Sequence, residues 1–298
     1  MILAHYGENR LIAGLTRNLV ADDSVRIGIG DDCAATGGRR ARTWQLLKTD
    51  CIVEGVHFLP EAVPRKIGWK SLARPISDIA AMGGLPRHAL VTMAISPTVE
   101  VRRVREIYAG IKKAADRFGV SIVGGETSRS PGPLFISIAL TGIVEASRCV
   151  TRSGGRAGDL LYVTGRLGGS ARGRHLDFIP RVAEARWLVE NFRPHAMMDL
   201  SDGLGADLPR LARASGTGFE ICEALLPCAR GCTPRNAITD GEDYELVFAI
   251  SARSAKRLEE KWRKKFPKLP LTRIGRLSGN LKFQISNFKF QNGFDHFA

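Results

Sequence analysis

The sequence lacks long hydrophobic runs and has few cysteines. No apolar stretch approaches the about 18 residues that cross a bilayer, and the longest, such as 89–95, have the length of a strand. The first residues include His5, Glu8 and Arg10 and contain no signal-peptide hydrophobic region. The six cysteines form no C-x-x-C pair, which argues against a disulfide scaffold and a zinc ribbon. We therefore expect a cytoplasmic protein with reduced thiols that does not associate with membranes.

The common nucleotide-binding and hydrolase motifs are also missing. The sequence has no G-x-x-x-x-G-K-[ST] loop, no H-R-D…D-F-G set, no G-x-S-x-G elbow and no H-E-x-x-H. Gly28 and Gly30 form a G-x-G pair without the third glycine of a dinucleotide-binding fingerprint. If the chain uses ATP, it must bind it in some other way.

Length and composition indicate a globular protein of about two domains. The 298 residues are 44% hydrophobic and 25% charged, and the 32 glycines exceed the about 21 expected from average usage. The net charge is +14, of which residues 251–298 carry +9, from twelve Lys or Arg against three acids. This charge favours an anionic partner, although a solvated basic surface is the simpler interpretation.

Strands that lead into glycine-rich loops and helices recur in both halves. The expected strands are 25–29, 44–47, 89–95, 121–123, 134–144, 160–164, 196–199, 218–221, 245–250, 282–285 and 288–290. The expected helices are 65–82, 99–118, 178–191, 204–215 and 255–266, and Pro75 predicts a kink or break in the first of these. We predict an α/β (α+β) protein with domains at 1–147 and 148–298.

Acidic residues follow several of these strands. Asp31 and Asp32, Asp50, Glu126, and Asp199 with Asp202 each come soon after an apolar run, and Asp78 lies on a predicted helix. Ligands of open α/β sheets lie beyond strand ends, and Mg²⁺ relieves the repulsion of clustered carboxylates while it bridges to phosphates. Each acid alone could equally form a turn or a helix cap. Together they predict a site for several Mg²⁺ ions and a polyphosphate ligand.

The motifs resemble the thiamine-monophosphate kinase family along nearly the whole chain. They are GIGDDCA (28–34), TD (49–50), EGVHF (54–58), SDIAAMG (77–83), GGET (124–127), TRSG (151–154), DLSDGL (199–204), GEDYEL (241–246) and GFDHF (293–297). The resemblance implies the fold of the aminoimidazole-ribonucleotide synthetase superfamily. In that fold, the N-terminal mixed sheet pairs with its twin in a dimer barrel, and an α/β domain follows. It also implies ATP-dependent, Mg²⁺-assisted phosphorylation of thiamine monophosphate to thiamine diphosphate.

Position by position, the resemblance assigns three sets of residues. The implied metal ligands are Asp32, Thr49, Asp50, Asp78, Glu126, Asp199 and Asp202. The implied ATP contacts are Tyr108, Gly125, Glu126, Arg152 and Ser201. The implied contacts to thiamine monophosphate are His57, Glu242 and Phe294. The acceptor phosphate is already ionised at neutral pH, so we assign no catalytic base.

Three positions depart from the family's pattern, and one of them, Pro75, would displace the helix that carries Asp78. Lys48 stands where many relatives have a small hydroxyl residue, so that it removes a metal contact or replaces one cation by a fixed positive charge. Glu126 is one methylene longer than the usual Asp, which shifts its metal or its loop. The segment 169–191 is short compared with relatives, so part of the wall around the substrate differs.

Two other interpretations are open at this stage. A different ATP-using member of the superfamily is one, such as a purine-precursor ligase or a selenophosphate-forming enzyme. The latter needs a reactive cysteine near its N-terminus, and residues 1–18 contain none. The other is a nucleic-acid-binding protein, because Phe283, Phe288 and Phe290 alternate with Lys282 and Lys289 in the basic tail.

Overall fold

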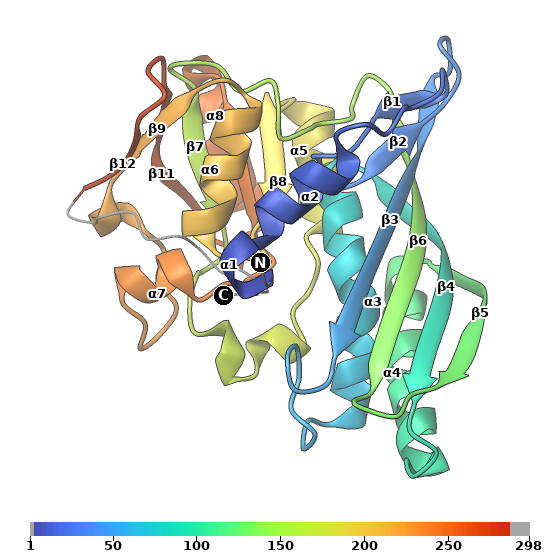
Figure 1. Ribbon diagram of the computed structural model, residues 1–298. Coiled ribbons are helices and arrows are strands. Elements are labelled where there is room, and N and C mark those ends of the chain that lie inside the picture. The colour runs from blue at the N-terminus through green and yellow to red at the C-terminus, as the bar shows by residue number, and fades with distance from the viewer. Residues whose placement is uncertain (1–2, 287–298) are drawn as a thin grey trace.

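The computed structural model describes residues 3–286, which form two six-stranded sheets with helices packed around them (Figure 1). The first half contains α1 Leu3–Tyr6, α2 Glu8–Thr16, β1 Val25–Ile27, β2 Ala34–Thr36, β3 Thr43–Val53, α3 Pro64–Ala81, β4 Leu85–Ile95, α4 Val101–Phe118, β5 Ser121–Arg129 and β6 Phe135–Glu145. The second half contains β7 Leu160–Thr164, α5 Val182–Asn191, β8 Ala196–Asp199, α6 Leu204–Ala214, β9 Gly218–Ile221, α7 Pro234–Thr239, β10 Leu246–Ile250, α8 Ala255–Lys265, β11 Leu271–Ser278 and β12 Phe283–Ile285. Within 3–286, no helix is both long and apolar enough to cross a membrane.

The first sheet has the strand order β1-β2-β3-β6-β4-β5. Only β4 and β5 run parallel, so the sheet is mixed, as predicted. Helices α3 and α4 pack together, and α3 covers β3, β4 and β6 on one face. The opposite face leaves Leu47, Leu90 and Val123 exposed. Side chains that alternate along β3 therefore face either α3 or this open surface.

Helix α3 is the element that joins the two halves. It also contacts β8 and α5 of the second half, and it is buried along most of its length. The helix continues through Pro75, so a break there, one of the two expected outcomes, is wrong. Pro75 lacks the N–H that would bond to the preceding turn, which costs a helix about 3 kcal/mol. The burial of apolar side chains along α3 compensates for this cost.

The second sheet has the order β12-β9-β11-β7-β10-β8 and is antiparallel except between β12 and β9. The buried residues form one core around the first sheet and two on the faces of the second. The mixed α/β architecture is the one predicted. The boundary between residues 147 and 148 stays a prediction.

Three expected strands are longer than predicted. The strand expected at 44–47 extends to Val53, the one expected at 121–123 extends to Arg129, and the one expected at 89–95 begins at Leu85. Asp50 and Glu126 therefore lie within strands, not after them. β3 is held by its continuous ladder with β6, and β5 is an exposed edge strand in which glycines are tolerated.

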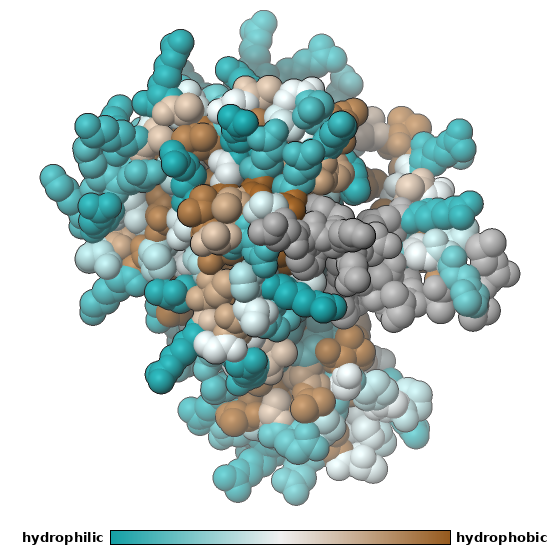
Figure 2. Space-filling model, turned by 90° about the vertical axis from the view of Figure 1, so that its left-hand side faces the viewer, coloured by the Kyte–Doolittle hydropathy of each residue, from teal (hydrophilic) through white to brown (hydrophobic). Residues whose placement is uncertain are grey.

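Some elements have no counterpart in the sequence-based prediction. These are α1, α2, β2, α7 and β11, which are short or have mixed polarity. The expected strand 288–290 lies outside the described residues. Figure 2 shows the left-hand side of the view in Figure 1, where hydrophilic side chains project around small hydrophobic areas.

Candidate active site

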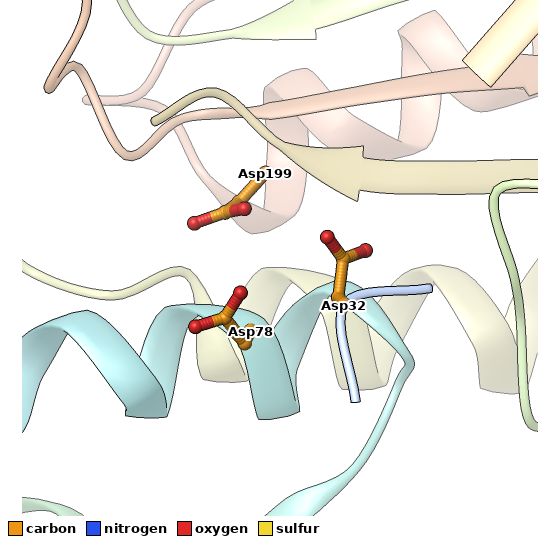
Figure 3. Close-up of side chains that lie close together, drawn as sticks. All are labelled: Asp32, Asp78 and Asp199. Carbon is orange, nitrogen blue, oxygen red and sulfur yellow. The ribbon is translucent and has the colours of Figure 1, made fainter. Parts of the chain in front are cut away.

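Three carboxylates from distant parts of the chain meet where α3 contacts β8 (Figure 3). Asp32 precedes β2, Asp78 lies on α3, and Asp199 is the last residue of β8. Each offers one oxygen, and these oxygens all lie within 4.8 Å of one another. All three side chains are buried, so the predicted convergence of acids occurs for this trio.

Each carboxylate of the trio has one polar partner. Arg152 donates to Asp32 Oδ1 from Nη2 at 2.6 Å and from Nε at 3.1 Å. Lys48 Nζ lies 2.9 Å from Asp78 Oδ1, and Ser77 Oγ donates to Asp199 Oδ2 at 2.6 Å. The other oxygen of Asp32, Oδ2, is buried without a hydrogen-bond partner. A buried carboxylate oxygen in this state is unfavourable unless a further cation or donor reaches it.

The electrostatics of the trio favour such a cation. Burial raises the pKa of Asp78 well above its usual range, which Lys48 partly opposes, and Asp199 adds to the rise. Burial, followed by the neighbouring Asp32, also raises the pKa of Asp199. A divalent cation opposes both causes by pairing with the ionised oxygens, and an all-oxygen donor set is the one that Mg²⁺ prefers. The residues present therefore fit a magnesium site.

Asp50 lies beside the trio on the helix-covered face of β3. Arg74 Nη2 is 3.2 Å from Asp50 Oδ1, and Arg74 Nη1 donates to the carbonyl of Cys51 at 2.8 Å. Burial alone lowers the pKa of Lys48, but Asp78 and Asp50 outweigh burial and raise the net pKa above its usual range. The lysine therefore remains an ammonium ion within the cluster.

A second acidic group follows β8. Asp202 pairs with Arg210, which also binds Asp207 at 2.8 Å, and the Asp202 backbone N–H donates to Asp207 Oδ2 at 2.9 Å. Burial and then Asp202 raise the pKa of the buried Asp207. Asp207 thus fixes the loop that presents Asp202 and Ser201 to the adjoining pocket.

That pocket lies between the loop that joins β3 to α3 and the loop before β10. Its lining residues are Val56, His57, Arg74, Ser201, Asp202, Asp240, Gly241, Glu242 and Tyr244. Lys70, which is fully buried, lies at the back of this pocket, where it donates to the carbonyl of His57 at 2.6 Å and pairs with Glu242 Oε1 at 2.5 Å. Burial lowers the pKa of Lys70 to about 8, although Glu242 acts in the opposite direction.

The Glu242 loop has an unusual backbone. Gly241, Glu242 and Tyr244 have φ angles of 68°, 53° and 50°, in a region that non-glycine residues rarely adopt. The strain is held by hydrogen bonds from Glu242 N–H to the Ser201 carbonyl at 2.6 Å and from Tyr244 N–H to the Leu200 carbonyl at 2.8 Å. Strained backbone of this kind concentrates at ligand sites.

Other predicted site residues lie apart from the trio. The side chain of Thr49 faces the open surface of the first sheet, and Glu126 is exposed on the edge strand β5. Tyr108 is 42% exposed on α4 and does not line the pocket. A Cβ at Gly125 would lie 1.9 Å from the Val91 carbonyl, so strand packing alone requires this glycine. Phe294 lies outside the described residues.

The sequence-based interpretation missed several residues of this region. Lys70 and Arg74 precede the predicted Asp78 by eight and four residues on α3, which places all three on one helix face. Asp207 follows Asp202 by five residues in the first turn of α6. The helical spacing could have identified the first group, whereas the role of Asp207 depends on tertiary contacts.

Comparison with known proteins agrees with this geometry. Residues 30–144 match the family described as AIR synthase related protein, N-terminal domain. The chain is similar to thiamine-monophosphate kinases of Rhodopirellula baltica, with 38% identity over 95% of this chain and 93% of that protein, and of Bacillus subtilis, with 30% identity over 96% and 98%. A solved structure of AaThiL complexed with AMPPCP and TMP has a TM-score of 0.86 at 32% identity and covers 99% of both chains.

The fold and the carboxylate trio thus define an AIR-synthase-related protein with two mixed sheets around one acidic site. Within that class, the chain belongs to the thiamine-monophosphate kinase family. The family and the fold class predicted from the motifs are confirmed.

Proposed function

We propose that this chain transfers the γ-phosphoryl group of ATP to thiamine monophosphate, giving thiamine diphosphate and ADP. The observation that carries the proposal is the buried trio Asp32, Asp78 and Asp199 with its unpartnered oxygen, next to a pocket lined by Glu242 and His57. Family membership supports both substrates, because the AaThiL structure was solved with AMPPCP and TMP.

The reaction requires alignment and charge neutralisation more than a covalent or basic group. The acceptor is a phosphate oxygen that is ionised at neutral pH, so no side chain has to remove a proton. Bound Mg²⁺, for which Asp32, Asp78 and Asp199 are the proposed ligands, supplies neutralisation of phosphate charge. Arg152, which is held by Asp32, is the proposed contact to the phosphates of ATP.

The pocket chemistry matches a cationic thiazolium ring with a phosphate attached. Glu242, Asp202 and Asp240 give the lining an acidic character that complements the ring's charge. His57 Nδ1 accepts from the Val53 N–H at 3.1 Å, so a neutral ring carries its proton on Nε2, the tautomer that can donate to a phosphate. Phe294 remains a proposed contact by resemblance.

Further roles are proposed from the resemblance. Asp50, Asp202, Thr49 and Glu126 are candidates for additional Mg²⁺ ions. Candidate ATP contacts, besides Arg152, are Ser201, Gly125, Glu126 and Tyr108.

We also propose that two copies pair through the open face of the first sheet. Its exposed Leu47, Leu90 and Val123 form an apolar area of the kind that marks an interface. Thr49 lies on this same face and Glu126 on its edge strand, so a partner would change the surroundings of both.

Light scattering tests this pairing. The molar mass in solution should be twice that of one chain for the wild type and that of a single chain for Leu90→Glu. A monomeric wild type contradicts pairing.

The proposed location is the cytoplasm, in keeping with six cysteines that are all free. We propose small-molecule partners and no nucleic acid, since the acidic site accounts for the phosphate chemistry. An alternative role in nucleic-acid binding would require steeply salt-dependent binding without nucleotide turnover.

The experiment is an assay of purified protein with ATP, Mg²⁺ and thiamine monophosphate. We expect equal amounts of thiamine diphosphate and ADP, and a loss of about a thousandfold in Asp50→Asn and Asp78→Asn while both remain folded. Asp116→Asn, at an exposed ion pair with Lys112, is the matched control and keeps full activity. A folded wild type that forms no thiamine diphosphate contradicts the proposal.

A further inference from the structure

Lys48 places a permanent positive charge inside the carboxylate site. It lies on β3, on the same side of the strand as Asp50 and opposite to Thr49, and its side chain is 23% exposed. Its Nζ atom is 2.9 Å from Asp78 Oδ1, and that aspartate side chain is 12% exposed. The ammonium therefore already pairs with one oxygen of Asp78, so a metal ion bound by this carboxylate would have to share it with Lys48.

The remaining carboxylates are not equivalent to Asp78. Asp50 is neutralised by Arg74, and Asp32 Oδ1 by Arg152. Asp199 Oδ2 accepts only the neutral hydroxyl of Ser77. Among the buried polar side-chain atoms of residues 3–286, the carboxylate oxygen without a partner is Asp32 Oδ2. Asp32 Oδ2 and the oxygens of Asp199 are thus without a charged partner, and these favour a divalent cation.

We propose that Lys48 is a resident cation of the site, and that the chain binds one divalent ion fewer than the same carboxylates would bind with a neutral residue at position 48. This inference rests on the proposed function only in taking the carboxylates as Mg²⁺ ligands. The physical reason is charge balance: a divalent ion at Asp78 must displace an ammonium that is already desolvated and paired, or remain close to it.

Lys48 should also stabilise the folded protein when no metal is bound. With the ammonium present, two of the three buried carboxylates have a cationic partner, Asp78 with Lys48 and Asp32 with Arg152. Without it, Asp78 and Asp199 lack a cation and repel each other until a metal ion binds or one of them takes up a proton. Stability should therefore depend on Mg²⁺ more strongly when position 48 is neutral.

The test counts Mn²⁺ ions bound per chain by electron paramagnetic resonance, with no nucleotide present. Wild type is compared with Lys48→Ser, with Lys48→Met, which keeps the apolar stem, and with the control Lys66→Ser. Lys66 forms an exposed ion pair with Asp177 at 2.6 Å, far along α3 from the site. We expect one additional Mn²⁺ in both Lys48 variants, bound about tenfold more tightly than any further ion in wild type, and no change in the control.

A second readout is the melting temperature in chelator and in Mg²⁺. The Lys48 variants should melt lower than wild type in chelator and recover more of the difference when Mg²⁺ is added. Equal Mn²⁺ numbers and equal Mg²⁺ responses in wild type and variants overturn the proposal, and so does a failure of every form to bind Mn²⁺. Neither readout needs turnover, so a chain that binds Mn²⁺ as expected but does not phosphorylate thiamine monophosphate overturns only the proposed function.

Discussion

At the residue scale, the site depends on charged side chains that are buried together with their partners. Lys70 has no exposed surface, yet its ammonium holds both the His57 carbonyl and Glu242. Such a pair contributes little net stability compared with apolar packing, but removing one partner leaves the other charge uncompensated. Lys70 therefore fixes the position of the Glu242 side chain, and the buried ammonium in turn requires the Glu242 carboxylate as its ionic partner.

Replacing Glu242 by Gln tests this dependence. We expect Glu242→Gln to lower the free energy of unfolding by about 2 kcal/mol, since the buried Lys70 loses its ionic partner. The KM for thiamine monophosphate should rise, because the pocket loses a negative charge. Glu106→Gln, which breaks an exposed pair with Arg65, is the control and should change neither quantity measurably. Urea unfolding and steady-state kinetics give both results; an unchanged stability in Glu242→Gln would show that Lys70 is held by other contacts.

At the scale of elements, the crossing of α3 and α4 sets the position of Asp78. Gly68 on α3 and Gly110 on α4 let the two backbones touch: an added Cβ would lie 1.8 Å from the Ile107 carbonyl oxygen in the first case and 2.0 Å from that of Arg65 in the second. Ala is the better helix former by about 1 kcal/mol, so propensity alone favours replacing both glycines. Close packing outweighs propensity here.

Gly110→Ala should therefore destabilise the protein by about 2–3 kcal/mol, because the helices must separate. In Gly14→Ala on α2, the added Cβ meets only Tyr6 Oη at 3.7 Å. This control should leave stability unchanged or raise it by up to about 1 kcal/mol. Thermal or urea unfolding of the two variants decides the matter, and equal stabilities would mean that the helices do not pack this closely.

At the scale of the whole molecule, Arg186 links the two halves through an ion pair and a hydrogen bond. Arg186 on α5 binds Glu145 at the end of β6 at 2.7 and 3.0 Å and also donates to the Gly83 carbonyl at 2.8 Å. The hydrogen bonds from Arg186 lower the pKa of Glu145 from about 4.5 to about 2. The half-exposed position of Glu145 limits the contribution of this pair.

The stability difference between wild type and Glu145→Gln should depend on pH. Because the folded pKa is depressed, the ionised Glu145 stabilises the protein fully above pH 4.5, and this contribution disappears as the pH falls toward 2. We expect wild type to be more stable by about 1 kcal/mol or less at pH 7, with the difference shrinking between pH 4.5 and 3. Urea unfolding across this range measures it, and a difference that does not vary with pH would refute the pairing.

The extent to which the sequence predicted this molecule also differs with scale. Residue motifs predicted the Asp32, Asp78 and Asp199 group, because a turn or a cap explains one such acid but explains several of them together less well. Element types were predicted where periodicity is strong, as in α3 and β6, but β5 was predicted too short because its glycines and Glu126 resemble a loop. The neighbours of Lys48 and the burial of Asp207 follow from contacts between distant segments, which no local pattern encodes.

The central claim is that carboxylates from both halves hold divalent cations for phosphoryl transfer. Anomalous diffraction from crystals grown with Mn²⁺ and a non-hydrolysable ATP analogue tests it directly. We expect an anomalous peak within about 2.5 Å of oxygens of both Asp32 and Asp199, with the analogue's phosphates bound to the same ion. Well-ordered nucleotide with no anomalous peak at these two side chains would contradict it.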